Sequence, residues 1–160
     1  MTATIRKILL PTDFSPCSER AIEYSAALAK RLGTSVHLIH TLDGPTVARG
    51  LWDPAVHDAR RRDRAYHAAK GRLAEVAQRL LPLATAVSAE VREGDAAEEI
   101  IKAAVDYGCD LVVMATHGRT GLPHLVMGSV AEAVIREAPC PVLTVRQSGA
   151  ARVSSARRVA

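Results

Sequence analysis

The sequence predicts an α/β protein built on a five-stranded parallel sheet with helices on both faces. Short apolar runs rich in branched residues alternate four times with longer segments of helical spacing, and a fifth apolar run follows. Four of the five runs are mostly apolar, which is typical of strands covered by helices on both sides. The length of 160 residues and the hydrophobic fraction of 48% suit a single domain with one core.

The strands are assigned from branched apolar runs bounded by turn-forming residues. They are expected at residues 8–11, 35–42, 87–91, 111–115 and 141–145. The third run differs from the others because Val87, Ala89 and Val91 alternate with polar residues, so only one of its faces is apolar. This pattern predicts that the third strand lies at an edge of the sheet.

The helices are assigned from apolar residues at helical spacing and from the residues that end each segment. They are expected at residues 19–32, 55–81, 96–107 and 129–138. Gly33 and Gly108 suit the left-handed position just past a helix end, and Pro82 and Pro139 stop the helices before them. Gly71 lies inside the second helix, whose first half is polar and basic, and predicts a kink or a break there.

Composition argues against several classes of function. The formal charge of +4 comes from four arginines after residue 145, since basic and acidic residues balance over 1–145. A neutral folded part offers no basic face for DNA, and an aromatic content of 3% offers no platform for stacking bases. The three cysteines, Cys17, Cys109 and Cys140, are odd in number and scattered, which argues against a disulfide framework and a zinc site.

The hydropathy of the chain predicts a soluble cytoplasmic protein. No stretch approaches the roughly 20 apolar residues of a membrane span, and residues 1–7 run into a strand without the features of a signal peptide. We expect one folded domain over residues 1–146. A flexible basic tail is expected over residues 147–160, which are rich in Ser, Ala and Arg.

The segment from Met114 to Val130 carries the chemistry. It leaves an apolar strand, passes two glycines and enters a helix at Gly128 and Ser129. The N-terminus of that helix offers unpaired backbone N–H groups and the positive end of the helix dipole, and glycine leaves room for a ligand. These features predict a site for nucleotide phosphates at the carboxyl ends of the strands, although glycines that only make turns would give the same spacing.

Residues 4–146 resemble the universal stress protein family. Three separated motifs carry the resemblance: Lys7–Ser15 at the start, Gly94–Asp95 before the third helix, and Thr116–Gly121 together with Gly128–Val130. The resemblance implies the adenine nucleotide alpha hydrolase-like fold, with strand order 3-2-1-4-5. It also implies a role in stress response or regulation.

The family divides into members that bind ATP and members that do not, and the binders resemble the pattern G-x2-G-x9-G-S/T. The corresponding positions here are Ala115, Gly118, Gly128 and Ser129, so the spacing is kept and only the first glycine is replaced. The resemblance therefore implies a site for Mg-ATP and no permanently bound metal. The methyl group of Ala115 either crowds the ribose or is tolerated.

The resemblance also assigns the residues of this site. The expected nucleotide-binding residues are Pro11, Thr12, Asp13, Thr41, Met114, Ala115, His117, Gly118, Arg119, Gly128, Ser129 and Val130. Backbone N–H groups of the glycine-rich segment would hold the phosphates, and the backbone at Thr41 would contact adenine. Asp13 either meets the ribose or a metal-bound phosphate, or caps the first helix. Arg119 either reaches a phosphate or points to solvent or a partner subunit, and Met114 either lines the pocket or packs in the core.

No catalytic constellation is evident, so we expect no dedicated enzyme activity beyond slow hydrolysis of ATP. His117 has neither a nucleophile nor an orienting carboxylate near it in the sequence and is interpreted as a residue that orders its loop. His57 and His67 are not at metal-ligand spacing. The arginines at 60–64 are interleaved with acidic residues, which favours a solvated helix face.

The last strand predicts how the protein assembles. Val142–Val145 is a short apolar run whose backbone would be unpaired at a sheet edge, and the resemblance implies a symmetric homodimer formed through it. Unidentified protein partners fit a regulatory role, whereas nucleic acid and membranes are not expected. Two other functions stay open: a nucleotide-free homodimeric interaction module whose pocket is closed by Ala115, and an enzyme that uses ATP to activate a substrate.

Overall fold

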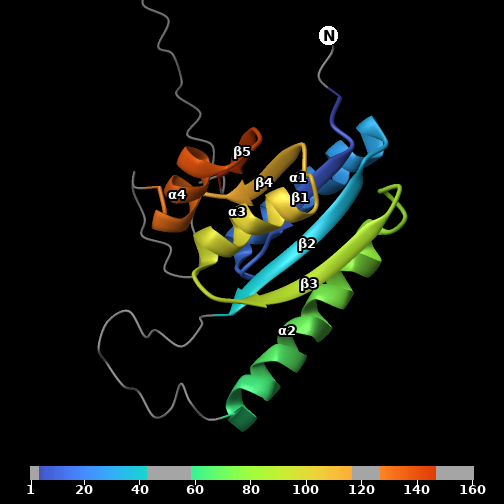
Figure 1. Cartoon of the computed structure of the whole chain (residues 1–160). Coiled ribbons are helices and arrows are strands. Elements are labelled where there is room, and N and C mark those ends of the chain that lie inside the picture. Colours follow the sequence, from blue (N-terminus) through green and yellow to red (C-terminus); the bar gives the residue numbers. More distant parts are fainter. Residues whose placement is uncertain (1–3, 43–58, 117–126, 147–160) are drawn as a thin grey trace, which may run out of the picture.

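A computed structural model describes residues 4–42, 59–116 and 127–146 of the chain. The five strands form one parallel sheet in the order β3-β2-β1-β4-β5, which confirms the predicted fold (Figure 1). The strands are β1 (Lys7–Pro11), β2 (Ser35–Leu42), β3 (Val87–Glu93), β4 (Leu111–Ala115) and β5 (Val142–Val145). The predicted tail at 147–160 lies outside the described residues, so the division into domain and tail stays a prediction.

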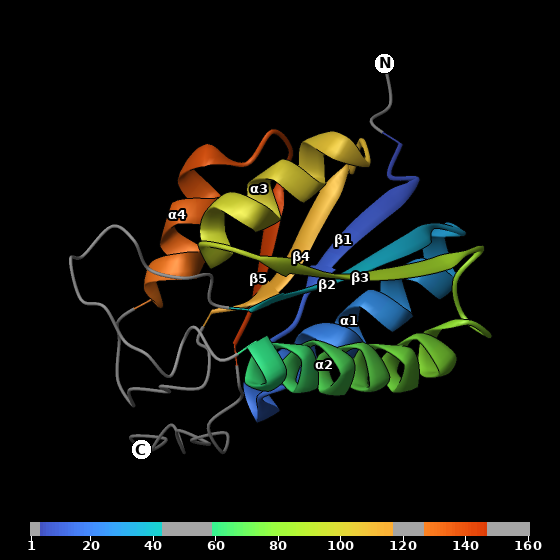
Figure 2. The same cartoon turned by 60° about the horizontal axis from the view of Figure 1, so that its bottom comes forward.

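Two pairs of helices cover the two faces of the sheet. The helices are α1 (Pro16–Leu32), α2 (Ala59–Leu80), α3 (Ala96–Asp106) and α4 (Ser129–Glu137). Figure 2 shows α1 and α2 on one side of the sheet and α3 and α4 on the other. The fully buried Leu10 and Val113 pack in the cluster with α1 and α2, whereas Leu9 and Val112 pack in the cluster with α3 and α4. Successive residues of one strand thus enter opposite cores, as a strand covered on both sides requires.

Local sequence sets the ends of the helices. α1 begins at Pro16, three residues before the predicted start, because the Ser15 side chain accepts a hydrogen bond from the backbone of Ser18 and Pro16 fits the first turn. It ends at Gly33, whose φ of 64° is the left-handed conformation expected there. α3 is capped similarly by the Asp95 side chain, which accepts a backbone N–H of the first turn.

Of the two alternatives considered at Gly71, a kink or a break, the break does not occur. α2 runs unbroken through Gly71, because the flanking Ala69, Leu73 and Val76 are buried and hold the backbone against the sheet. Gly71 itself is exposed, and a methyl group added there would meet no atom within 4 Å. Burial of the apolar neighbours therefore outweighs the weak helix propensity of one glycine. The part of the predicted helix before Ala59 lies outside the described residues.

Replacing Gly71 with alanine is expected to stabilise the protein by roughly 1 kcal/mol. Alanine loses less backbone freedom on folding than glycine, and its methyl group has free space at this position. Urea unfolding followed by circular dichroism measures the change in the free energy of unfolding. A loss of stability would contradict the picture of an unbroken helix with open space around Gly71.

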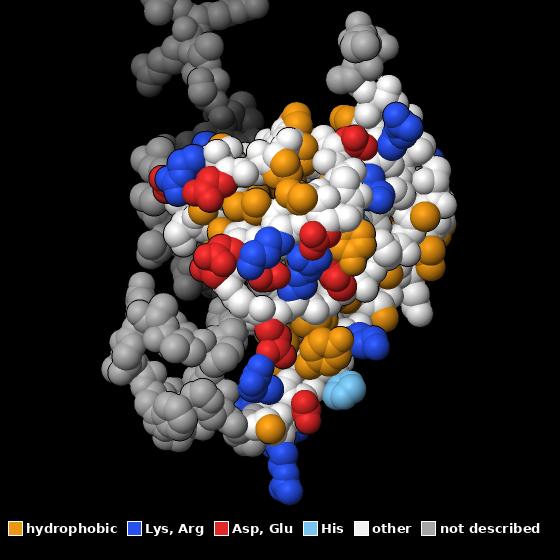
Figure 3. Space-filling model, viewed as in Figure 1, with side chains coloured by type: hydrophobic (Ala, Val, Ile, Leu, Met, Phe, Trp, Pro, Cys, Tyr) orange, Lys and Arg blue, Asp and Glu red, His pale blue; other side chains and the backbone are white. Residues whose placement is uncertain are grey.

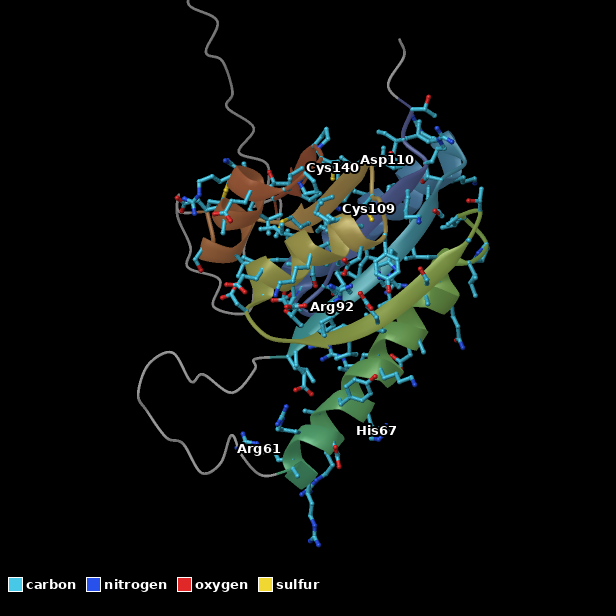
Figure 4. All side chains as sticks on the ribbon, in the orientation of Figure 1. Arg61, His67, Arg92, Cys109, Asp110 and Cys140 are labelled. Carbon is cyan, nitrogen blue, oxygen red and sulfur yellow. The ribbon has the colours of Figure 1, made fainter. Side chains whose placement is uncertain are left out.

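β3 lies at an edge of the sheet, as its alternating pattern predicts. A polar cluster fastens it to α3. The Glu90 carboxylate accepts hydrogen bonds from the Arg92 guanidinium (2.6 Å) and the Tyr107 hydroxyl (3.0 Å). Arg92 also donates to Asp106 of α3 (2.8 Å), where β3 approaches that helix (Figure 4). His37 of β2 stacks on the Tyr107 ring with 3.7 Å between the ring centroids, so the edge strand is held by side chains as well as by its backbone.

Charged side chains and cysteines of the described residues are distributed as follows. On the face seen in Figure 3, acidic and basic side chains are interspersed over α3 and β3 rather than gathered by sign. The three cysteines are free thiols, and burial raises the pKa of Cys109 to about 11, which keeps this thiol protonated at neutral pH. No helix in the described ranges is both long and apolar enough to cross a bilayer.

Candidate functional site

A pocket of about 200 Å³ opens at the carboxyl ends of the strands. It lies between the ends of β1 and β4, because the chain runs outward from β1 to β3 and then returns to the other side of β1. In open parallel sheets such a reversal leaves a crevice, since the connections on its two sides depart toward opposite faces. The lining residues are Pro11, Thr12, Asp13, Ser18, Ile39, Thr41, Ala96, Ile100, Met114, Ala115, Thr116, Gly128, Ser129, Val130 and Ala131.

The structure brings nine of the twelve predicted site residues to this pocket. They are Pro11, Thr12, Asp13, Thr41, Met114, Ala115, Gly128, Ser129 and Val130. The other three, His117, Gly118 and Arg119, lie outside the described residues, and their positions stay predictions. That any of the twelve contacts a nucleotide is likewise still a prediction.

Six lining residues go beyond those expected from the sequence. They are Ser18, Ile39, Ala96, Ile100, Thr116 and Ala131. Three of them carry a signal in the sequence: Thr116 begins the Thr116–Gly121 motif, Ile39 shares a face of β2 with Thr41 two residues later, and Ala96 follows the Gly94–Asp95 motif. Ser18 carries none, because nothing in its local sequence shows that the start of α1 borders the pocket.

The N-terminus of α4 forms a polar wall of the pocket. Gly128 is the N-cap residue and provides no side-chain hydrogen bond to the first turn, unlike Ser15 of α1 and Asp95 of α3. Residues 129–131 of this first turn line the pocket, and their N–H groups lie at the positive end of the helix. The N–H of Gly128 donates to the carbonyl oxygen of Thr116 (2.9 Å), which ties the helix start to the end of β4. This wall therefore favours an anion.

The loop between β1 and α1 forms a second wall that is fixed by hydrogen bonds. The backbone N–H of Thr12 donates to the carbonyl of Ile39 (2.9 Å), and the Thr12 hydroxyl donates to the hydroxyl of Ser18 (3.1 Å). The Thr12 hydroxyl oxygen also accepts the N–H of Phe14 (3.0 Å). Thr12 and Ser18 are buried, so these bonds satisfy polar groups that water cannot reach and give the loop a defined shape.

Asp13 places a carboxylate on this wall. Burial raises the pKa of the carboxyl group, but hydrogen bonds from Ser15 and Ser18 together outweigh burial, and the pKa lies below its usual value. One of these bonds runs from the N–H of Ser15 to Oδ1 of Asp13 (3.0 Å). Of the two roles considered for Asp13, the N-cap of α1 is held by Ser15 instead, and contact with a nucleotide stays a prediction. Asp13 is thus a charged group of the pocket at neutral pH.

Apolar side chains complete the pocket. Met114 is 5% exposed, lines the pocket and packs in the core beneath α3 and α4, so both roles considered for it hold. Ile39 and Ile100 lie in the same cluster and line the pocket with it. Ala115 ends β4 opposite Val145 of β5 and also borders the cavity. Such a surface suits the flat ring of a base.

Ionisable side chains are few in the described lining of the pocket. Asp13 is the one ionisable residue among the described lining residues, which by themselves offer no acid–base pair. Across residues 4–42, 59–116 and 127–146, no group of three His, Cys, Asp or Glu side chains lies close enough to hold a metal ion. A divalent cation at this pocket would therefore need further coordinating oxygen atoms besides those of the Asp13 carboxylate.

The parallel sheet in this strand order, with a pocket between the carboxyl ends of β1 and β4, defines a protein of the adenine nucleotide alpha hydrolase-like fold. Residues 4–146 match the universal stress protein family. The chain belongs to this family, which confirms the resemblance seen in the sequence motifs.

Individual relatives agree with this assignment. Universal stress protein MJ0531 of Methanocaldococcus jannaschii is 34% identical over 146 residues, which cover 89% of this chain and 82% of that relative. The solved structure of MJ0577, a universal stress protein of the same organism, has a TM-score of 0.81 at 29% identity and covers 91% of this chain and 99% of that one. A universal stress protein solved in complex with cAMP has a TM-score of 0.68 and covers 92% of this chain and 100% of that one. Its identity of 20% shows a likeness of fold alone.

Proposed function

We propose that this protein is a cytoplasmic stress-response or regulatory protein that binds ATP, as Mg-ATP, in the pocket between β1 and β4. The observation that carries the proposal is the N-terminus of α4, where Gly128 leaves the first turn without a side-chain cap on the pocket wall. A helix end of this kind binds phosphate through its backbone N–H groups and its dipole. The role would be exerted through protein partners.

The glycine-rich pattern supports ATP over a smaller anion. Ala115, Gly128 and Ser129, three of the four positions of the pattern, border the same pocket. The phosphates would lie against the first turn of α4, and the base would lie against the apolar side chains near Thr41 and Met114. The pocket of about 200 Å³ has Ala115 in its lining, which supports a site that stays open beside this methyl group.

Asp13 supports the magnesium form of the nucleotide. A charged carboxylate on the pocket wall would repel a bare triphosphate. A magnesium ion bound to phosphate oxygens and to Asp13, directly or through water, would remove this repulsion. The ion would arrive with the nucleotide, because Asp13 is the one carboxylate among the described lining residues.

A thermal-shift titration tests the proposal. Mg-ATP at a concentration 100 times its Kd is expected to stabilise the protein by about 2.7 kcal/mol, which raises the melting temperature in a concentration-dependent way. No rise at millimolar Mg-ATP would contradict ATP binding and favour a nucleotide-free interaction module. We expect no release of AMP or pyrophosphate, and release of both would instead indicate an enzyme that activates a substrate.

We also propose that the protein forms a homodimer through β5. The alternative function, a nucleotide-free interaction module, would involve the same dimer. β5 lies at the sheet edge, is four residues long, and has Leu143 38% exposed. A second copy would pair with the free edge of its backbone and cover this side chain. Sedimentation equilibrium separates a dimer from a monomer of 17.1 kDa. A monomer at micromolar concentration would contradict the dimer and leave the nucleotide proposal untouched.

A further inference from the structure

Phe14 has an unusual backbone conformation in the loop that carries Asp13. Its φ of 60° is the one positive value among the non-glycine residues of the described chain. Bulky residues rarely adopt this left-handed conformation, because the Cβ atom crowds the backbone, so surrounding contacts must hold Phe14 there. Its neighbours on either side are the pocket carboxylate, Asp13, and the N-cap residue of α1, Ser15.

Two side chains from different elements contact Phe14. The His40 ring, from β2, has its centroid 4.5 Å from the centroid of the Phe14 ring. The guanidinium carbon of Arg72, from α2, lies 4.2 Å from the same centroid. Nη2 of Arg72 also donates a hydrogen bond to the carbonyl oxygen of Phe14 (3.3 Å). We call these three residues the Phe14 clamp.

The Phe14 clamp also fixes the backbone on the other side of Asp13. His40 is 6% exposed, and its Nδ1–H donates to the carbonyl oxygen of Thr12 at 2.7 Å. A carbonyl only accepts hydrogen bonds, so this nitrogen carries the proton. The His40 side chain therefore contacts both neighbours of Asp13: it donates a hydrogen bond to the carbonyl group of Thr12 and packs against the ring of Phe14. Asp13 lies between two residues that are both anchored to β2, and Arg72 adds an anchor to α2.

We propose that Arg72 is a positioning residue for the nucleotide site. It is not among the residues that line the pocket and acts through Phe14. By holding the ring and the carbonyl group of Phe14, Arg72 maintains the left-handed turn that keeps the Asp13 carboxylate on the pocket wall. The inference rests on the proposed binding of Mg-ATP. It makes the affinity of the site depend on the contacts of one α2 side chain, Arg72, with Phe14.

Arg79 provides a matched control on the same helix. Like Arg72, it is an exposed arginine of α2 that bonds to a neighbouring element, in this case Glu19 of α1. Its partner lies beyond the loop that carries Asp13. Loss of Arg79 therefore weakens the docking of α2 without releasing Phe14, whereas loss of Arg72 releases Phe14.

The test uses the fact that Phe14 is the only phenylalanine of the chain. Incorporation of 4-fluorophenylalanine gives a single ¹⁹F signal from the loop. Full-length wild type, Arg72→Gln, Arg72→Lys and Arg79→Gln are compared by calorimetric titration with Mg-ATP and, in labelled form, by ¹⁹F NMR. Arg72→Gln is expected to raise the Kd of Mg-ATP about two- to fivefold and to move the ¹⁹F signal of the free protein. Arg72→Lys keeps the positive charge and is expected to restore most of the Mg-ATP affinity and most of the wild-type ¹⁹F shift. Arg79→Gln is expected to match the wild type in both measurements.

The outcomes separate the positioning role from the proposed function. If the wild type binds Mg-ATP and Arg72→Gln binds it equally well, Arg72 has no positioning role and the proposed function stands. If Arg79→Gln loses as much affinity as Arg72→Gln, the effect belongs to α2 docking in general and the role of Arg72 is refuted. If the wild type itself does not bind Mg-ATP, both proposals fail.

Discussion

Valine in place of Gly128 is expected to abolish the binding of Mg-ATP and to leave the fold intact. Gly128 lines the pocket as the N-cap residue of α4, and a branched side chain there would occupy the space beside the first-turn N–H groups. Its φ of −63° and ψ of 145° are open to any residue, so the backbone does not require glycine. The substitution therefore acts on the ligand, and calorimetric titration is expected to show a Kd raised about 100-fold or more.

Gly71→Ala is the control for this experiment, because it replaces a glycine with a larger residue away from the pocket. We expect it to bind Mg-ATP with unchanged affinity. Circular dichroism and the melting temperature show whether Gly128→Val is folded. A folded Gly128→Val that still binds Mg-ATP as the wild type does would mean that the phosphates do not lie at the start of α4.

Asparagine in place of Asp13 is expected to remove the dependence of ATP affinity on magnesium. The pKa of Asp13 lies below its usual value, so the group is charged at neutral pH and opposes a bare triphosphate. Asparagine keeps the oxygen that accepts the N–H of Ser15 and loses the charge. In the wild type, magnesium is expected to tighten ATP binding about tenfold or more, whereas Asp13→Asn should bind ATP with similar affinity in magnesium and in EDTA.

Asp110→Asn is the matched control for the charge change. Asp110 precedes β4 at the opposite, amino-terminal edge of the sheet and accepts the backbone N–H groups of Arg6 (2.8 Å) and Lys7 (2.9 Å) (Figure 4). These bonds hold the pKa of its carboxyl group below its usual value. We expect magnesium to change the ATP affinity of Asp110→Asn as much as it changes that of the wild type. If Asp13→Asn weakens ATP, ADP and AMP equally and keeps the magnesium effect, Asp13 meets the ribose rather than a metal-bound phosphate.

The layers of the fold could be predicted from the sequence because burial leaves a simple pattern in strands. β1 and β4 are apolar on both faces, and the alternation of β3 marks an edge. The ends and continuity of helices were harder to predict. Ser15 and Pro16 start α1 earlier than its apolar residues suggest, and packing of Leu73 carries α2 through Gly71. These features depend on a cap and on tertiary contacts, which outweigh local propensity.

The site could be predicted where it consists of strand ends and a helix start. The family resemblance predicted Pro11, Thr41 and Met114, and the structure places all three in the pocket at the carboxyl ends of the parallel strands, which meet at one edge. The Phe14 clamp could not be predicted in this way. In the sequence Phe14 stands in an ordinary turn, and the carbonyl group that Arg72 contacts is 58 positions away along the chain. Such contacts are fixed by the packing of α2 and leave no local pattern.

A crystal structure of the protein with Mg-ATP tests the central claim most directly. We expect phosphate oxygens within about 3 Å of the backbone nitrogens of residues 129–131, with a magnesium ion between the phosphates and Asp13. Phosphates bound elsewhere on the chain, or an α4 start covered by protein atoms and closed to the nucleotide, would contradict the proposed function.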